Sequence, residues 1–274
     1  MELKKINYAK LLKQANVSYL GATRHSAKMN YSYNNGYETY CLYLAPSTMA
    51  RDKDHKYINL CPKSAMCKDA CLNGSGRNRG DIIKNGVKFS KINQARVKKT
   101  HLFYDNRELF MELLIHEIEK YQKHAKNNNM GFAIRLNGTS DLSPLLFKHN
   151  GKNILELFPN VQFYDYTKVY NRIKLSEQYP NYDITFSYDG TNWLECQDYL
   201  NKGGKVAIVF DTTDENGKQI LPTTYMGYKV IDANETDTRF LDEGGCIMGL
   251  HYHRTANDYV SGKYVAPQTP FIVR

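Results

Sequence analysis

The sequence has no long apolar stretch and no stretch dominated by proline, glycine or serine. No run approaches the ~18 consecutive apolar residues that a membrane-spanning helix needs. The first twenty residues contain four lysines among scattered apolar residues, so they lack the continuous apolar core of a secretory signal. We therefore expect a cytoplasmic protein without a membrane partner.

The same absences bear on domain organisation. The 274 residues, 42% of them hydrophobic, suffice for one sizeable core, and no linker-like stretch divides them. We predict a single domain over residues 1–274, with an N-terminal extension at 1–37 and a cysteine-containing basic loop at 46–86. Two closely packed domains are the alternative. The six cysteines should be reduced in the cytosol, as ligands, nucleophiles or core residues rather than disulfides.

Positive charge is concentrated in one part of the chain. Residues 51–100 contain 13 Lys or Arg against 4 Asp or Glu, an excess of +9 that equals the excess of the whole chain. The remainder is therefore neutral on balance. A segment that carries all of the excess positive charge suits nucleic acid or a phosphorylated small molecule as the partner. A solvated basic face without a partner is the alternative.

Short apolar runs alternate with amphipathic stretches. Apolar residues at three and four spacing predict one or two helices within 87–126, and further helices are expected at 144–158, 170–178 and 192–201. This alternation predicts an α/β fold with a largely parallel sheet. The number of strands suits a partial or distorted (β/α) TIM-like barrel, with a doubly wound open sheet as the alternative. Strands are predicted at residues 38–45, 132–136, 161–166, 184–187, 206–210, 228–231 and 247–251.

Polar residues directly follow most of the predicted strands. The carboxyl ends of strands converge on one site in barrels and in open α/β sheets, so these residues are pocket candidates. Asp and Asn are also common in turns and helix caps, so some of them should be structural only. The candidates are Arg135, Asn137, Thr139, Asp141, Asp165, Thr167, Lys168, Ser187, Asp211, Asp232, Asn234, Asp237, His251 and His253.

Three thiols lie within eleven residues, at Cys61, Cys67 and Cys71. Cys67 and Cys71 share a face if a helical turn connects them, and Cys61 can fold back onto them. Three converging thiolates can hold Zn²⁺ together with a fourth ligand, or three irons of an Fe–S cluster with one iron left open. The nearest candidates for a fourth ligand are Cys41, His55 and His25.

The spacing of these thiols differs from the paired CxxC motifs of zinc fingers and from the CxxxCxxC of radical S-adenosylmethionine enzymes. Their place, in the loop after the first predicted strand, nevertheless resembles the layout of the latter, which makes S-adenosylmethionine a candidate cofactor. The alternative is that all three are buried as small apolar residues. Cys196 and Cys246 fall in a predicted helix and at a strand start, where we expect core residues.

A glycine- and arginine-containing loop, residues 73–80, follows the cysteines directly. Glycines let backbone amides approach an anion closely, and arginines add charged donors, so the loop is a candidate phosphate or cofactor site. No Gly-Lys-Ser/Thr follows, so it is not a P-loop. A surface loop without a ligand is the alternative. The candidate binding residues are Gly74, Gly76, Arg77 and Arg79.

Several motifs of the sequence together point to one family. They are Tyr43 to Pro46, Cys61-Pro62 with Cys67 and Cys71-Leu72, Gly76-Arg77, Lys99-Thr100, Arg135 to Asp141, Phe163 to Lys168, Val209 to Asp211 and Arg239 to Asp242. This set resembles the phage gene product 88-like family. The resemblance covers about residues 40–255 and implies a protein encoded in a bacteriophage genome, without implying a particular activity. It also implies that the cysteine loop and the segments around Asp141 and Lys168 form one site.

The leading hypothesis is a metal-centred enzyme of the infected host's cytosol that acts on nucleic acid or a nucleotide. The three clustered cysteines would hold Zn²⁺ or an Fe–S cluster. Arg135 and Lys168 would clamp an anion, and Asp141 or Asp165 would serve as acid or base. The predicted catalytic set is Arg135, Asn137, Asp141, Asp165 and Lys168.

Two other functions stay open. His251 and His253, followed by Tyr259 and Lys263, are similar to the metal-binding pair and the nucleophile of DNA-nicking replication initiators. Alternatively, the protein is a non-catalytic binder in which zinc staples the cysteine loop and the basic segment grips nucleic acid or a host protein.

Overall fold

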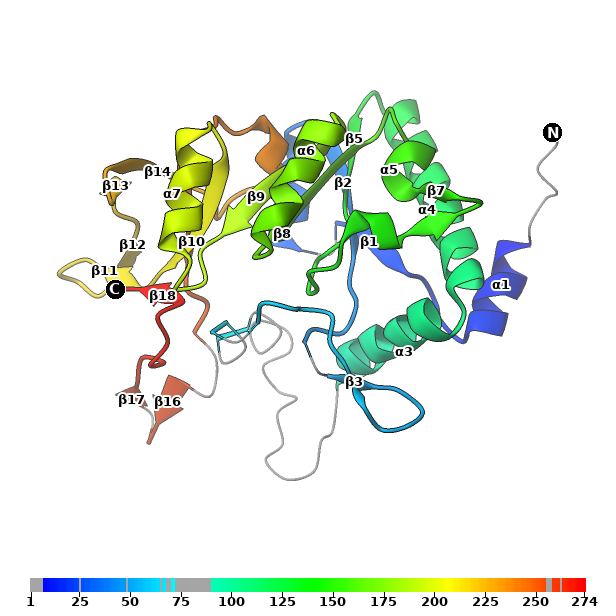
Figure 1. The fold of residues 1–274 in the computed structure, drawn as a ribbon, viewed down its shortest axis with the longest axis horizontal. Coiled ribbons are helices and arrows are strands. Elements are labelled where there is room, and N and C mark those ends of the chain that lie inside the picture. The colour runs from blue at the N-terminus through cyan, green and yellow to red at the C-terminus, as the bar shows by residue number, and fades with distance from the viewer. Residues whose placement is uncertain are drawn as a thin grey trace. The chain divides into compact units, whose positions relative to one another are not determined.

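The computed structural model describes residues 7–24, 26–47, 49–64, 66–67, 70–71, 90–254, 258–261 and 263–274, without the side chains of residues 259 and 260. Seven α-helices and a mostly parallel main sheet in this part of the chain make it a mixed α/β protein (Figure 1). The chain divides into two compact units, one of residues 1–61 and 91–163 and the other of residues 62–90 and 164–274. The single domain over residues 1–274 stays a prediction.

The first unit is built on strands that lie beside one another in the order β1, β2, β5 and the start of β8. β1 is antiparallel to β2, whereas β2 and β5 are parallel, and β5 is parallel to the first residues of β8. The strands of this unit are β1 (Gly21–Thr23), β2 (Tyr37–Leu42), β3 (Ala50–Arg51), β4 (Tyr57–Ile58), β5 (Gly131–Arg135), β6 (Lys148–His149), β7 (Lys152–Asn153) and the start of β8 (Gln162–Thr167).

Two long helices, α3 and α4, follow one another in this unit and contact each other at an angle (Figure 1). They confirm the helices predicted within 87–126. Asn106 separates them because its side chain accepts a hydrogen bond from the Leu109 N–H and so caps α4. The helices of the unit are α1 (Tyr8–Ala15), α2 (Ala27–Asn34), α3 (Lys91–Asp105), α4 (Arg107–Asn127), the 3₁₀ helix η4 (Pro144–Leu146) and α5 (Ile154–Leu157).

One predicted helix, at 144–158, is wrong over most of its length. The structure has η4, then the antiparallel hairpin β6–β7, and only then the short α5. Asn150 and Gly151 both adopt positive φ, 49° and 79°, which is the backbone of a two-residue hairpin turn. An Asn-Gly pair favours this reversal over a helix, and its local turn chemistry overrode the apolar spacing.

The second unit contains a parallel group of strands. β10 is parallel to β9 on one side and to β15 on the other, and β15 is parallel to β14. The short β13 pairs antiparallel with β14. The strands are the end of β8, β9 (Tyr182–Ser187), β10 (Lys205–Phe210), β11 (Thr212–Thr213), β12 (Gln219–Ile220), β13 (Thr224–Tyr225), β14 (Tyr228–Asp232), β15 (Ile247–His251), β16 (Tyr259–Val260), β17 (Lys263–Tyr264) and β18 (Ile272–Val273).

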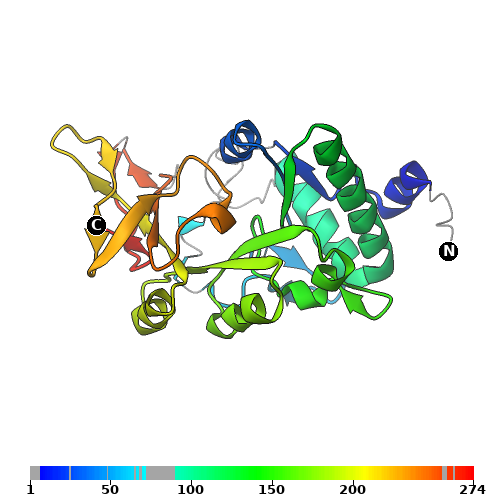
Figure 2. The same ribbon diagram turned by 90° about the horizontal axis from the view of Figure 1, so that it is seen from above.

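The helices of the second unit are short, and α6 and α7 cover the same face of its sheet (Figure 2). All six strands predicted after residue 130 are confirmed, as β5, β8, β9, β10, β14 and β15. None of the helices in the described residues is long and apolar enough to span a bilayer. The helical segments of this unit are η5 (Tyr170–Ile173), α6 (Lys174–Gln178), α7 (Trp193–Asn201) and η6 (Arg239–Leu241).

The predicted α/β class and the largely parallel sheet are confirmed, but the TIM-like barrel is not. Among the residues that the structure describes, no closed barrel is present. Each unit ends its strand order with a short antiparallel strand, β1 in the first and β13 in the second. A barrel of repeated βα units needs parallel neighbours all the way round, so an antiparallel hairpin at the end of the order does not continue it.

Candidate functional site

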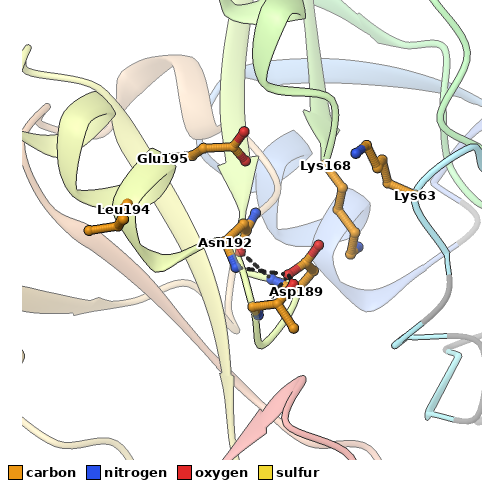
Figure 3. Close-up of a pocket in the computed structure, with 7 residues that line it drawn as sticks. Lys63, Lys168, Asp189, Asn192, Leu194 and Glu195 are labelled. Carbon is orange, nitrogen blue, oxygen red and sulfur yellow. Dashed lines mark hydrogen bonds between the residues drawn. The ribbon is translucent and has the colours of Figure 1, made fainter.

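A pocket of about 350 Å³ lies in the second unit, at the carboxyl ends of β8 and β9 (Figure 3). Lys168 directly follows β8, and Asp189 comes two residues after β9. The start of α7 completes the wall, and one further lysine comes from the cysteine loop. The lining residues are Lys63, Lys168, Asp189, Thr191, Asn192, Leu194 and Glu195.

The loop between β9 and α7 is held by Asp189. One oxygen of its carboxylate accepts hydrogen bonds from the N–H and the hydroxyl of Thr191, both at 2.8 Å, and from the Asn192 N–H at 3.1 Å. Gly190 has φ +97°, and a Cβ there would lie 2.5 Å from the Pro270 carbonyl carbon. A side chain at residue 190 would therefore displace the C-terminal segment that closes this loop.

Asn192 precedes α7 but does not cap it. Its side-chain oxygen accepts from the Asp189 N–H at 2.8 Å, and its amide donates to the Ser187 carbonyl at 3.1 Å. The first N–H groups of α7 consequently donate no hydrogen bond to a capping side chain. Uncapped amides at a helix start attract an anion.

The charges around the pocket are mixed. Lys63 and Lys168 supply two ammonium groups, whereas Asp189 and Glu195 supply carboxylates (Figure 3). The Lys168 Nζ lies 5.1 Å from the ring centre of Phe271, a cation–π contact that restricts the lysine. The pocket can thus hold a ligand with both an anionic group and hydrogen-bond donors.

Among the predicted catalytic residues, Lys168 lines this pocket. Asp165, on β8, is only 2% exposed, and its Oδ2 lies 3.5 Å from the Tyr182 hydroxyl oxygen. Its carboxylate is therefore buried inside the protein. The structure assigns Lys168 and Asp165 to the second unit and the other three predicted catalytic residues to the first.

Arg135, Asn137 and Asp141 lie in one segment at the carboxyl end of β5. Asn137 is 2% exposed, and its side-chain oxygen accepts from the Ser140 hydroxyl and the Leu142 N–H, both at 2.8 Å. Its amide also donates to the Leu142 carbonyl at 2.9 Å. These contacts hold the loop in shape, and a catalytic role for Asn137 stays a prediction.

The first cysteine lies beside this segment. The Asp141 N–H donates to the Leu60 carbonyl at 2.8 Å, and the Cys61 thiol lies 3.7 Å from the Thr139 carbonyl. The Ser47 N–H in turn donates to the Cys61 sulfur at 3.2 Å. The structure therefore brings one of the predicted metal ligands together with one predicted catalytic segment.

The three clustered cysteines, Cys61, Cys67 and Cys71, are partly exposed, whereas the other three are buried. The Cys67 thiol lies 3.7 Å from the Ser64 carbonyl. Within the described ranges, no group of three His, Cys, Asp or Glu side chains is placed to hold a metal ion. The metal centre remains a prediction, and His25, one suggested fourth ligand, lies outside the described residues.

The prediction that Cys196 and Cys246 belong to the core is confirmed, since they are 0% and 6% exposed. Burial raises the pKa of the Cys196 thiol to about 12, so this cysteine is neutral and unreactive at physiological pH. Cys41, which was suggested as a fourth metal ligand, lies on β2 and is 1% exposed.

The remaining predicted residues are divided between described and undescribed parts of the chain. The loop candidates Gly74, Gly76, Arg77 and Arg79 lie outside the described residues. His251 ends β15, and its buried Nδ1 has no hydrogen-bond partner within the described part of the chain. The nicking hypothesis built on the two histidines stays a prediction.

The chain matches the model of the family described as Gene product 88 over residues 1–261, nearly its whole length. The protein belongs to the Gene product 88 family. This confirms the resemblance based on the sequence motifs and the expectation of a bacteriophage protein. No curated protein and no solved structure shows a significant match to the chain.

In this member of the Gene product 88 family, sequence reasoning missed most of the pocket. Asp189, Thr191 and Glu195 were not among the candidates, and Lys63 was seen only as part of the basic segment. The signal that could have found them is Asp189-Gly190-Thr191-Asn192, a turn sequence directly between a predicted strand and a predicted helix. In parallel sheets such strand-to-helix turns line the ligand site.

Proposed function

We propose that this protein binds a nucleotide unit, free or within a nucleic acid, in the pocket at the carboxyl ends of β8 and β9. The observation that carries the proposal is the pair of lysines, Lys63 and Lys168, at a pocket that also holds the uncapped start of α7. Ammonium groups and helix N–H groups are complementary to a phosphate.

The acidic residues of the pocket fit the rest of such a ligand. A nucleotide carries sugar hydroxyls and base N–H groups, which donate hydrogen bonds to carboxylates. Glu195, in the first turn of α7, is exposed and is the acceptor suited to this role. The volume of about 350 Å³ lies within the usual range of small-ligand sites.

The charge distribution along the chain supports the same ligand class. Lys63 belongs to residues 51–100, the segment that carries all of the excess positive charge. A basic segment that contributes a residue to a pocket attracts polyanions toward that pocket and increases their association rate.

The test is binding of a labelled mononucleotide and a labelled oligonucleotide to the full chain at low salt. Lys63→Ala and Lys168→Ala should each weaken binding about 10-fold, because each removes one charge-assisted phosphate contact. The slope of log affinity against log salt should fall by about one for each lysine. Lys202→Ala is the matched control, since this exposed lysine of the second unit pairs with Asp198 and lines no part of the pocket.

Two results would reject the proposal. One is that the unaltered protein binds neither the mononucleotide nor the oligonucleotide. The other is binding that both lysine variants retain at the strength of the Lys202→Ala control.

The second candidate function is the metal-centred enzyme, and one observation favours it. The three cysteines that cluster in the sequence are also the three that are partly exposed, so they are the thiols accessible to a metal. Protein purified without oxygen should then contain iron with broad absorbance near ~400 nm, or zinc without colour. Replacing Cys67 with Ser should lower the metal content, and replacing Cys196 with Ser should not. Reconstituted protein that holds neither metal would reject this function.

A further inference from the structure

A second cationic cluster lies in the same unit, around Asp211. Asp211 directly follows β10, and its side chain is only 2% exposed. The Arg254 Nη2 lies 3.2 Å from one carboxylate oxygen, the Arg274 Nε lies 3.8 Å from the other, and the Tyr264 hydroxyl donates to that second oxygen. One buried carboxylate thus faces two guanidinium groups.

Strand pairing brings these distant residues together. β15 is parallel to β10 with His251 opposite Phe210, so Arg254 emerges three residues later beside Asp211. β18 is also parallel to β10, with Val273 opposite Phe210, and Arg274 follows directly. The Asp211 N–H donates to the Val273 carbonyl at 2.8 Å, which fixes this register.

The arginines are positioned but not buried. Their side chains are 28% and 35% exposed for Arg254 and Arg274, respectively. The Arg254 guanidinium lies 4.0 Å above the Tyr264 ring, which restricts its orientation. Burial and the Asp211 carboxylate raise the pKa of Tyr264 to about 12, so its hydroxyl keeps its proton and orients Asp211.

The charge at this cluster is not balanced by Asp211 alone. One carboxylate offsets one of the two guanidinium charges. The buried carboxylate of Asp258, in the same segment, accepts a hydrogen bond from the Tyr252 hydroxyl at 2.8 Å. Planar guanidinium groups held at a partly exposed position are suited to a phosphate or another oxyanion.

The C-terminal segment connects this cluster to the pocket. β9 pairs with β10 only as far as Ser187 opposite Ala207, and β18 then takes the same side of β10 from Val209 onward. Phe271, just before β18, contacts the Lys168 ammonium, and Arg274, just after it, contacts Asp211. Lys168 and Asp211 therefore contact the two ends of one four-residue segment, residues 271–274.

The separation decides what kind of ligand reaches both positions. Phe271 and Arg274, which contact Lys168 and Asp211, are three residues apart, and at ~3.3 Å per residue of extended chain this separates them by about 10 Å. A single phosphate does not span that distance, whereas a chain of nucleotides carries phosphates at successive positions. We propose that the arginine pair Arg254 and Arg274 binds a second phosphate of the same ligand, which makes the ligand a nucleic-acid chain rather than a free nucleotide. This inference rests on the proposed function of the pocket.

The test compares a labelled mononucleotide with single-stranded oligonucleotides of up to roughly eight nucleotides, on the full-length protein. The unaltered protein should bind the longest oligonucleotide at least about 10-fold more tightly than the mononucleotide. Arg274→Gln and Arg254→Gln should remove most of this gain and leave mononucleotide binding within about 2-fold. Lys168→Ala should weaken both ligands, and Lys202→Gln, which also removes one positive charge, should change neither.

Arg254→Gln takes a partner from a buried carboxylate, so thermal unfolding is measured for every variant. Arg274→Gln removes the longer contact with Asp211 and keeps an amide donor for the Pro267 carbonyl, to which the Arg274 Nη2 donates at 2.6 Å, so it is the variant that separates binding from folding. If both arginine variants still bind the oligonucleotide as tightly as the unaltered protein, whatever their midpoint of unfolding, the inference is overturned. The cluster would then only anchor β18.

The outcomes also separate this inference from the proposed function. If Lys168→Ala weakens oligonucleotide binding and neither arginine variant does, only the second subsite is overturned. If the arginine variants weaken oligonucleotide binding and Lys168→Ala does not, the pocket is overturned and the arginine site is kept. If the unaltered protein binds the oligonucleotide no more tightly than the mononucleotide, or binds neither, the inference is overturned.

Discussion

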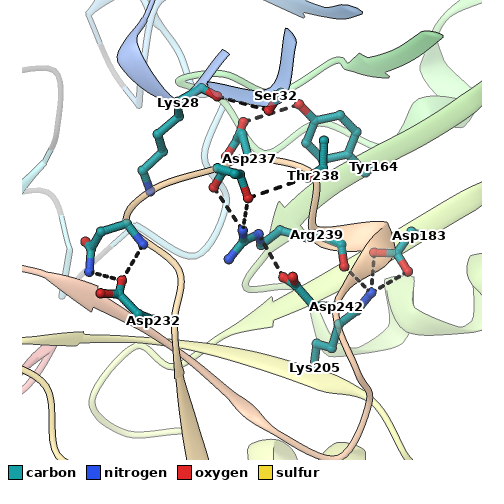
Figure 4. Close-up of polar contacts among 12 residues, drawn as sticks. Lys28, Ser32, Tyr164, Asp183, Lys205, Asp232, Asp237, Thr238, Arg239 and Asp242 are labelled. Carbon is teal, nitrogen blue, oxygen red and sulfur yellow. Dashed lines mark hydrogen bonds and ion pairs between the residues drawn. The ribbon is translucent and has the colours of Figure 1, made fainter. Parts of the chain in front are cut away.

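In the second unit, the amino ends and the carboxyl ends of the parallel strands use the same residue types in opposite ways. We call them the amino edge and the carboxyl edge of the sheet. At the amino edge, Lys205 begins β10 and donates to both carboxylate oxygens of Asp183, at 2.8 and 2.7 Å, and to the Arg239 carbonyl at 2.6 Å (Figure 4). The Lys205 side chain is 8% exposed. At the carboxyl edge, Lys63 and Lys168 line an open pocket (Figure 3).

This difference distinguishes charges that hold the fold from charges that meet a ligand. A buried lysine whose donors are all satisfied by protein acceptors has no capacity for another partner, and its loss leaves buried acceptors unpaired. A partly exposed lysine at a pocket can offer its ammonium group to a ligand at little cost in stability. The same comparison predicts that the two edges can be disabled separately.

At neutral pH, the largest expected effect is on stability at the amino edge. Lys205→Met keeps the apolar stem but removes the ammonium group, and it should lower the free energy of unfolding by about 3 kcal/mol because Asp183 loses its partner. Denaturant unfolding measures this change. Nucleotide binding, measured on the folded variant, should stay within about 2-fold. A variant that loses binding without losing stability would show that the amino edge is not purely structural.

The next effect sharpens the comparison with a buried lysine of the first unit. Lys99, on α3, is 5% exposed, donates to the Leu20 carbonyl at 2.6 Å and lies 4.5 Å from the Tyr19 ring centre. Burial lowers its pKa from 10.5 to about 8, against the opposing effect of the Glu117 carboxylate. Between these two pH values the unfolded chain holds a proton that the folded protein has lost.

Stability should therefore depend on pH through Lys99. From pH 8 upward to 10.5, the free energy of unfolding should rise relative to that of Lys99→Met by about 1.4 kcal/mol per pH unit. Below pH 8 the lysine is protonated in both states and the difference should be constant. Denaturant titrations at several pH values measure it, with the exposed Lys98→Met as control. A difference that stays flat through this window would contradict the lowered pKa.

The smallest effect is expected at the pocket. Lys168→Ala should change the free energy of unfolding by less than about 0.5 kcal/mol, as is usual for a partly exposed side chain, while ligand binding weakens. Thermal and denaturant unfolding of the variant test this. A loss of more than about 2 kcal/mol would mean that Lys168 holds the Phe271 segment in place, and the contrast between the edges would disappear.

Sequence reasoning found most of the strands and less of the site. The run at residues 206–210 is apolar and β-branched, so it could be assigned to a buried strand, and it is β10. Lys168 was found because it follows such a run. Asp189 and Lys63 were missed because one follows a strand by two residues and the other lies in a loop far away in the chain. Hydrophobic periodicity is a local property, so it does not indicate which loops come together in the folded protein.

The same limit applies to the residues around Asp211. Asp211 was a candidate because it ends a strand, yet Arg254, Tyr264 and Arg274 carry no pattern that links them to it. Their meeting depends on the register of β15 and β18 against β10. Register is set by side-chain packing and backbone hydrogen bonds across the sheet, which are non-local.

The sequence by itself determined the α/β class, the positions of the main strands, the excess of positive charge in residues 51–100 and the family. These properties follow from local periodicity, composition and motifs. Only the tertiary structure decided that the strands form no closed barrel in the described residues, and which cations share one edge. Closure and convergence depend on contacts between residues far apart in the chain, and the energy of those contacts is not encoded in any short segment.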